Sequence, residues 1–175
     1  MSDDGSQMDH PQRRRIVIVG AGFSGLGMAI RLKQSGVDDF VVFERDEEVG
    51  GTWWANTYPG CQCDIPSHLY SFSFAPNPEW TRTYPLQPEI REYLRACADR
   101  FGLRAHIRFR CPVQRAEWDE REGVWQIDTP DGRFSAQVLI GAPDRSASPR
   151  FRRFPGSRIS EASPSTPRGG PTSTI

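Results

Sequence analysis

The sequence has no net charge, no long hydrophobic run and only one lysine. Its 22 basic and 22 acidic residues cancel, and Lys33 is the single lysine among them, a bias typical of GC-rich coding. A chain without net charge has no long-range field to attract nucleic acid or an anionic membrane. The longest apolar stretch, residues 16–23, is far shorter than the roughly 20 residues of a membrane-spanning helix. We therefore expect neither nucleic acid nor a membrane as a partner.

An export signal and a metal-ligand pattern are also missing. The first 15 residues are polar and contain no apolar signal-peptide core. Without an export signal, the four cysteines are expected to be reduced thiols of a cytoplasmic protein. Cys61, Cys63 and His68 could ligate a metal, but they lack a fourth ligand and the usual zinc spacing. We therefore predict no metal site.

Three stretches of different composition divide the 175 residues. Residues 1–12 have the composition of a flexible leader. Residues 13–141 carry the hydrophobic patterns and predict one domain of ordinary size. Residues 142–175 consist mainly of Ser, Pro, Arg, Gly and Thr without apolar periodicity, so we expect a disordered tail.

The first part of the domain has the pattern of a βαβ unit. Residues 16–19 and 40–43 are short apolar runs, as expected for parallel strands buried on both faces. Residues 24–34 between them keep the three-four apolar spacing of a helix, and Gly36 follows as a C-terminal stop. We therefore predict a right-handed crossover between two parallel strands.

The rest of the domain predicts a second helix and a small antiparallel meander. Residues 88–101 carry an apolar stripe at helical spacing, with Pro88 suited to the first turn. Short alternating runs follow and are separated by turn signals; they lie at residues 107–109, 113–118, 124–127 and 134–140. The predicted fold class is α/β, a Rossmann-like domain with a parallel sheet and a meander.

A glycine-rich turn joins the first strand to the first helix. Gly20, Gly22 and Gly25 fit the GxGxxG pattern in its proper context, between a buried strand and a helix. Gly20 permits the tight turn, Gly22 allows a phosphate to approach the backbone, and Gly25 allows close helix packing. This arrangement directs backbone N–H groups and the positive end of the helix at a pyrophosphate. We predict an adenine dinucleotide site.

The residues after the second strand bear on which dinucleotide binds. Glu44 ends that strand, where a carboxylate accepts hydrogen bonds from ribose hydroxyls and repels the 2′-phosphate of NADP. FAD and NAD both remain possible on this ground. A second glycine turn at Gly50 and Gly51 suits the longer ligand, FAD.

The segments GAGFSGL, GGTWWANTYPG, CQCDIPSHLYSFSF and PNPEWTRTYPLQPEIREYL occur in the order in which the class B flavin monooxygenases contain them. The chain resembles most closely the N-terminal FAD-binding half of the Baeyer-Villiger group, over about residues 13–142. The resemblance implies an FAD- and NADPH-dependent monooxygenase that uses O2 to insert oxygen into ketones or to oxidise soft heteroatoms. It places FAD contacts at Gly20, Gly22, Phe23, Ser24, Gly25, Glu44, Gly51, Thr52, Trp53, Asp64, Tyr70 and Val113.

Asp64 is the one catalytic candidate, because the family has an Asp here beside flavin and nicotinamide that supports the catalytic Arg. A turn-capping role for Asp64 is the alternative. Trp53 is expected to line the flavin pocket, whereas Trp54 and Tyr58 are expected to pack in the core.

The family's second GxGxxG, its catalytic Arg and its NADPH-binding domain are not found in these residues. The likeness stops after about residue 142, and the residues that follow resemble the translation of GC-rich DNA read out of frame. We therefore expect a truncated or frameshifted product. The alternative to an enzyme is a non-catalytic remnant that at most binds FAD.

Overall fold

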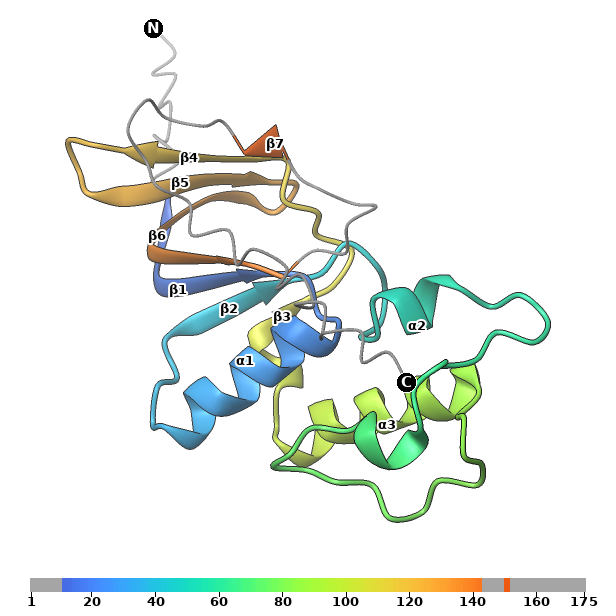
Figure 1. The fold of residues 1–175 in the computed structure, drawn as a ribbon. Helices are drawn as coiled ribbons and strands as arrows, with labels where there is room; N and C mark the ends of the chain where they lie inside the picture. The colour runs from blue at the N-terminus through green and yellow to red at the C-terminus, as the bar shows by residue number, and fades with distance from the viewer. Residues whose placement is uncertain (1–10, 143–149, 152–175) are drawn as a thin grey trace, which may run out of the picture.

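The computed structural model describes residues 11–142 and 150–151. One seven-stranded sheet has the order β3-β2-β1-β6-β5-β4-β7 (Figure 1). Its strands are β1 (Gln12–Val19), β2 (Phe40–Phe43), β3 (Ile107–Arg108), β4 (Arg115–Asp119), β5 (Val124–Thr129), β6 (Gly132–Gly141) and β7 (Arg150–Phe151). The helices are α1 (Phe23–Gln34), α2 (Thr52–Ala55) and α3 (Gln87–Arg100), with 3-10 turns η1 (Ser67–Leu69) and η2 (Arg104–His106).

The predicted βαβ unit is confirmed. Strands β1 and β2 pair in parallel from Ile16 with Phe40 to Val19 with Phe43, and α1 connects them. Strand β1 starts at Gln12, earlier than the apolar run, because β6 pairs with it along its whole length. Gly36 has a φ of +75° just after α1, which is the conformation that favours glycine at a helix stop.

The meander prediction is right for three of the four runs. Strands β4, β5 and β6 pair antiparallel in sequence order. The prediction for residues 107–109 is wrong, because β3 lies parallel to β2, with Val42 opposite Ile107. The reason is that the backbone beyond β2 also bonds this segment: the N–H of Glu44 donates to the carbonyl of Arg108 at 2.9 Å. The parallel sheet therefore has one strand more than the sequence indicated.

Strand β6 belongs to both parts of the sheet. One of its edges pairs antiparallel with β5 and the other pairs parallel with β1. Phe134 lies opposite Gln12 at the start of β1, whereas Phe43 lies opposite Val19 at the end of β1. The two phenyl rings are nevertheless 4.8 Å apart. The sheet must therefore curl, so that the meander lies over one face of β1 and β2, as Figure 1 shows.

Two cores lie on the two faces of the parallel strands. The core under the meander contains Val17, Val19, Val41, Phe43, Cys111, Val113, Ala116, Ile127, Phe134 and Ala136. On the opposite face, α1 and α3 bury a larger core that includes Ile16, Ile18, Leu26, Ile30 and Leu94. The strict alternation of β1 residues between the two cores is what a strand buried on both faces requires.

The long segment between β2 and α3 is held by hydrogen bonds to buried groups rather than by regular structure. The hydroxyl of Tyr93 donates to the carbonyl of Ala75 and accepts from the N–H of Phe72, both at 2.8 Å. Burial raises the pKa of Tyr93, so this phenol stays protonated and able to donate. The N–H of Cys63 donates to the carbonyl of Pro85 at 2.9 Å. The loop is thereby fixed against α3.

At the two ends of the described chain, hydrogen bonding extends beyond the expected domain limits. Gln12 is paired in β1, and the N–H of Ala142 donates to the carbonyl of Val19 at 2.9 Å. Residues 150–151 pair in parallel with β4. Of the predicted leader (1–12) and tail (142–175), residues 1–10, 143–149 and 152–175 lie outside the described residues. No helix in the described part is long and apolar enough to cross a bilayer.

The contact between Phe134 and Phe43 gives a direct test of the curled sheet. Phe134 is 1% exposed, so Phe134→Ala removes a buried ring. We expect the free energy of unfolding to fall by roughly 3–5 kcal/mol, measured by urea denaturation. Val138→Ala in the same strand is the control, because Val138 is 45% exposed. Equal effects of the two substitutions would contradict the packing of the meander on the parallel strands.

Candidate functional site

The first glycine turn forms at the carboxyl end of β1. The N–H of Gly20 donates to the carbonyl of Phe43 at 2.8 Å, and Gly20 has a φ of +100°. A Cβ on Gly25 would lie 1.8 Å from the carbonyl oxygen of Gly20, so only glycine fits there. Gly22 precedes α1 as its N-cap residue. The first N–H groups of α1, which have no partner within the helix, are thus open to an anion.

The second glycine turn lies directly against the first. The N–H of Gly50 donates to the carbonyl of Ala21 at 3.0 Å. A Cβ on Gly51 would come within 3.1 Å of the Cα of Gly22, and Gly51 has a φ of +55°. The sequence predicted both turns, but only the structure brings them into contact. The backbones of the two glycine turns, which carry no side chains at these positions, therefore lie at one common site.

Glu44 connects strand β2 to the first glycine turn. Its carboxylate is buried, with Oε2 accepting from the N–H of Ala21 at 2.6 Å and Oε1 from the N–H of Asp46 at 3.0 Å. Its own carbonyl accepts from the N–H of Cys111 at 2.9 Å. Each carboxylate oxygen has two lone pairs, so one on each oxygen is left to accept from a ligand hydroxyl.

An aromatic wall stands beside the two turns. The indole N–H of Trp53 donates to the hydroxyl of Tyr70 at 3.0 Å, and the ring of Phe23 meets that of Tyr70 edge-on at 4.9 Å. Burial raises the pKa of Tyr70, and the nearby charges of Cys63 and Asp64 raise it further. These three rings come from α1, α2 and the end of η1, so the predicted aromatic candidates are brought together.

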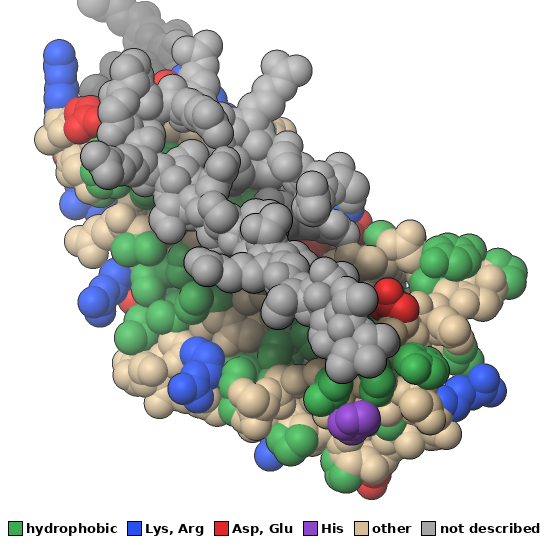
Figure 2. Space-filling view, viewed as in Figure 1, with side chains coloured by type: hydrophobic (Ala, Val, Ile, Leu, Met, Phe, Trp, Pro, Cys, Tyr) green, Lys and Arg blue, Asp and Glu red, His purple; other side chains and the backbone are tan. Residues whose placement is uncertain are grey.

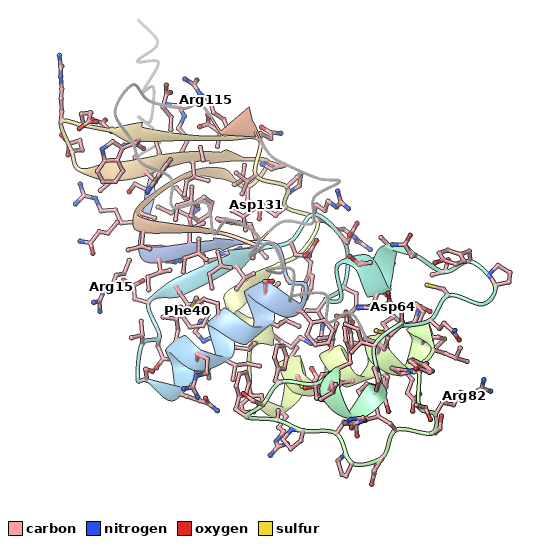
Figure 3. The ribbon with its side chains drawn as sticks, viewed as in Figure 1. Arg15, Phe40, Asp64, Arg82, Arg115 and Asp131 are labelled. Carbon is pink, nitrogen blue, oxygen red and sulfur yellow. The ribbon has the colours of Figure 1, made fainter. Side chains whose placement is uncertain are left out.

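Two candidates lie apart from this cluster. Asp64 is exposed on the loop before η1, and Figure 3 shows it between α2 and α3. Val113 is buried in the core under the meander. In the described part of the chain, no hydrogen bond joins the side chain of Asp64 to the glycine turns. Tyr58 is 61% exposed, so its expected core position is wrong; Trp54 is half-buried with the guanidinium of Arg91 5.9 Å from its ring.

Sequence reasoning missed an ion-pair network that holds the second glycine turn. The carboxylate of Glu48 accepts from the guanidinium of Arg104 and lies 3.2 Å from the Nε of Arg95, and Arg104 also binds Asp99 at 2.7 Å. Glu48 directly precedes Val49 and the turn. An acidic run before the turn was visible in the sequence, but nothing in it singled out Glu48.

Gln87 is a second missed residue. It is buried, and its side-chain amide donates to the carbonyl of Trp53. This bond ties α2 to the first turn of α3, so the wall residue Trp53 is held by its backbone as well as by its indole.

The cysteines and potential metal ligands complete the inventory of reactive side chains. All four cysteines are buried and unpaired. In residues 11–142, no three His, Cys, Asp or Glu side chains come together in a way that could hold a metal ion.

A glycine turn opening a helix, next to a strand that ends in a buried carboxylate, defines the Rossmann-like dinucleotide-binding class. Residues 18–85 accordingly match the family model described as NAD(P)-binding Rossmann-like domain. A Baeyer-Villiger monooxygenase of Streptomyces coelicolor is 52% identical over 142 residues, covering 81% of this chain and 27% of the relative. The FAD-binding monooxygenase tazF of Aspergillus terreus is 42% identical over 137 residues, covering 74% and 24%.

Solved structures agree with the sequence relatives. The closed crystal structure of cyclohexanone monooxygenase superposes with a TM-score of 0.73 at 35% identity, covering 83% of this chain and 28% of that one. The chain is thus similar to a part of Baeyer-Villiger and other FAD-binding monooxygenases, as the resemblance in the sequence indicated. The chain spans about a quarter of the length of the relatives it matches.

The Glu48 network predicts a pH-dependent stability. Burial raises the pKa of Glu48, but hydrogen bonds from Arg104 and Val49 and the charges of Arg104 and Arg95 outweigh it, so the pKa lies below its ordinary value. A carboxylate with a lowered folded pKa stabilises the fold above its unfolded pKa, and this stability is lost as the pH falls through the folded pKa. We therefore expect the free energy of unfolding to decrease on acidification.

Glu48→Gln isolates this contribution. At neutral pH we expect a loss of roughly 1.5–3 kcal/mol, typical of a hydrogen bond to a charged group, and a flatter dependence on pH below about pH 5. Urea denaturation across that range measures both quantities. The control is Glu47→Gln, because Glu47 is 55% exposed in its pair with Arg110 and should change little. A Glu48→Gln profile parallel to that of the parent chain would count against the network.

Proposed function

We propose that residues 13–141 are the first half of the FAD-binding domain of an NADPH-dependent Baeyer-Villiger monooxygenase. The observation that carries the proposal is the contact between the two glycine turns beside the buried carboxylate of Glu44. Its substrates would be ketones or compounds with soft heteroatoms, together with O2. The relatives named above support this choice of reaction.

The glycine turns have the steric properties that a pyrophosphate needs. Gly25 cannot carry a Cβ, and the approach of Gly51 to Gly22 leaves backbone exposed where side chains would otherwise stand. The N–H groups of Phe23 and Ser24, at the start of α1, would bind the pyrophosphate. Glu44 would accept from the ribose hydroxyls.

The remaining candidates suit the longer parts of FAD. Gly51 and Thr52 lie on the second turn and would follow the ligand beyond its pyrophosphate. Trp53 and Tyr70 form a wall that can pack on an aromatic ring, and the backbone at Val113 would meet adenine. FAD, when bound, supplies the redox and oxygen chemistry of the reaction.

Asp64 is the residue that we assign to the reacting end of the site. The charge of Asp64 contributes to the raised pKa of Tyr70, which supports this assignment. Its exposure on this chain leaves it free to support a cation contributed from elsewhere in the enzyme. By the resemblance, this cation is the family's catalytic Arg.

The surface around α2 and η1 fits a chain that packs against further protein. Figure 2 shows hydrophobic side chains at this surface. Large apolar side chains exposed there include Tyr58 at 61%, Leu69 at 67% and Tyr84 at 46%. Exposed apolar groups gathered in one region indicate an interaction site. We propose that NADPH and substrate are bound with the help of such further parts, and that the protein is cytoplasmic, in line with its reduced cysteines.

A non-catalytic product that at most binds FAD is the second candidate. It differs from the first proposal in activity and not in cofactor.

Gly22→Leu tests the cofactor site. Gly22 has a φ of −79°, so leucine is compatible with the backbone, while its side chain would fill the space between the two turns. We expect the parent chain to acquire flavin absorbance near 450 nm after incubation with FAD and gel filtration, and Gly22→Leu to lose it. Gln34→Leu, at the other end of α1, is the control. A parent chain that is folded by circular dichroism but takes up no FAD would refute the cofactor proposal.

The 175-residue chain by itself is expected not to oxidise NADPH at an enzymatic rate. The physical reason is that, among the residues that the structure describes, no Arg or Lys pairs with Asp64, and such a cation is needed to stabilise developing negative charge. NADPH absorbance at 340 nm, with FAD, O2 and cyclohexanone present, measures the rate. Ketone-dependent consumption coupled to lactone formation would show that this part is a complete enzyme and would eliminate the second candidate.

A further inference from the structure

A cavity lies at the end of the sheet opposite to the glycine turns. It has a volume of about 650 Å³, and its lining includes Arg13, Arg14, Arg15, Gln126 and Ser135. These arginines belong to the start of β1, whereas the first glycine turn follows the end of that strand. Figure 3 shows Arg15 on the far side of the molecule from Asp64. The cavity is therefore distinct from the proposed FAD site.

Ser135 lines this cavity and is 5% exposed as a residue. Within the described residues its hydroxyl makes no hydrogen bond, so it is available to a ligand. The sheet register places Arg13 on one side of it and Gln126 on the other. A guanidinium, a hydroxyl and an amide thus stand in one row across three strands, at the spacing of cross-strand neighbours. A ligand with acceptor atoms could accept hydrogen bonds from all three groups of this row.

The three arginines of the cavity are also free of counter-ions. In the described part of the chain none of their guanidinium groups forms an ion pair, unlike those of Arg95 and Arg104. The guanidinium of Arg14 donates to the carbonyl of Arg13 at 2.8 Å. Two carboxylates, Asp39 and Glu122, also line the cavity, and Asp39 accepts from the backbone N–H of Arg15 at 3.1 Å. The ionised side chains leave an excess of one positive charge.

We propose that this cavity binds the phosphate group of a small phosphorylated molecule. Guanidinium forks match the geometry of phosphate oxygens and bind them through charge-assisted hydrogen bonds. A phosphate offers acceptors to Arg13 and Ser135 at once, while the amide of Gln126 binds a further oxygen. The volume lies in the range of small-molecule sites, so the cavity has room for more than a bare ion. The proposal does not depend on the flavin site.

Amide chemical shifts of the 15N-labelled chain locate the binding directly. Inorganic phosphate and adenosine monophosphate are titrated separately at constant ionic strength. We expect both to shift the amides of residues 12–15, 122–126 and 135–137, with the organic phosphate binding more tightly. Equal affinity of the two would limit the site to the phosphate ion itself and overturn the phosphorylated ligand. Shifts confined to residues 20–25 and 50–52, or no shifts, would overturn the site.

Substitutions test the role of the row. Arg13→Gln and Ser135→Ala should each weaken binding of adenosine monophosphate about tenfold or more, since each removes a hydrogen bond to a charged group. Arg82→Gln is the control, because Arg82 is exposed and does not line the cavity. Circular dichroism establishes that the variants fold. An equal loss of affinity in Arg13→Gln and Arg82→Gln would show a nonspecific charge effect and contradict the proposal. Unchanged affinity in Arg13→Gln or Ser135→Ala would contradict it as well.

Discussion

The hydrogen bond from the N–H of Ala21 to the buried carboxylate of Glu44 is the contact on which the site depends. It fixes the first glycine turn to the end of β2. The carbonyl of the same Ala21 accepts from the N–H of Gly50, so the second turn is fixed to the first. A single residue, Ala21, thus positions the carboxylate and both glycine turns. Losing this contact would leave one oxygen of the buried Glu44 carboxylate without its protein partner and would release the turn from β2.

Strand β6 supports this contact from the other side of the sheet. By pairing with both β1 and β5, it carries the meander over the parallel strands, where the rings of Phe134 and Phe43 meet. Phe43 is the residue before Glu44, and its carbonyl holds the N–H of Gly20. The meander therefore packs on the very strand end that presents the carboxylate.

The other face combines apolar packing with polar ties. The core under α1 and α3 buries the apolar side of the βαβ unit, while Glu48 bonds to Arg95 and Arg104 and Gln87 bonds to Trp53. This segment has little regular structure, so these side-chain contacts add to scattered backbone hydrogen bonds such as that from the N–H of Ser67 to the carbonyl of Thr83 at 2.7 Å. Polar side chains from α3 and η2 thus help to hold residues 45–87 in place, as backbone pairing holds a strand in a sheet.

The sequence alone determined the elements that are encoded locally. Two apolar runs around a helix, and glycines at 20, 22 and 25, specify a βαβ unit and a tight turn through spacing and steric limits within a few residues. Glu44 was likewise predicted from its place after a strand. Only the tertiary structure decided which segments meet: β3 beside β2, the two glycine turns against each other, Arg95 and Arg104 on Glu48, and Ser135 beside Arg13. Periodicity records which side of an element is buried and does not record which distant segment covers it, because that choice is made by packing of the whole chain.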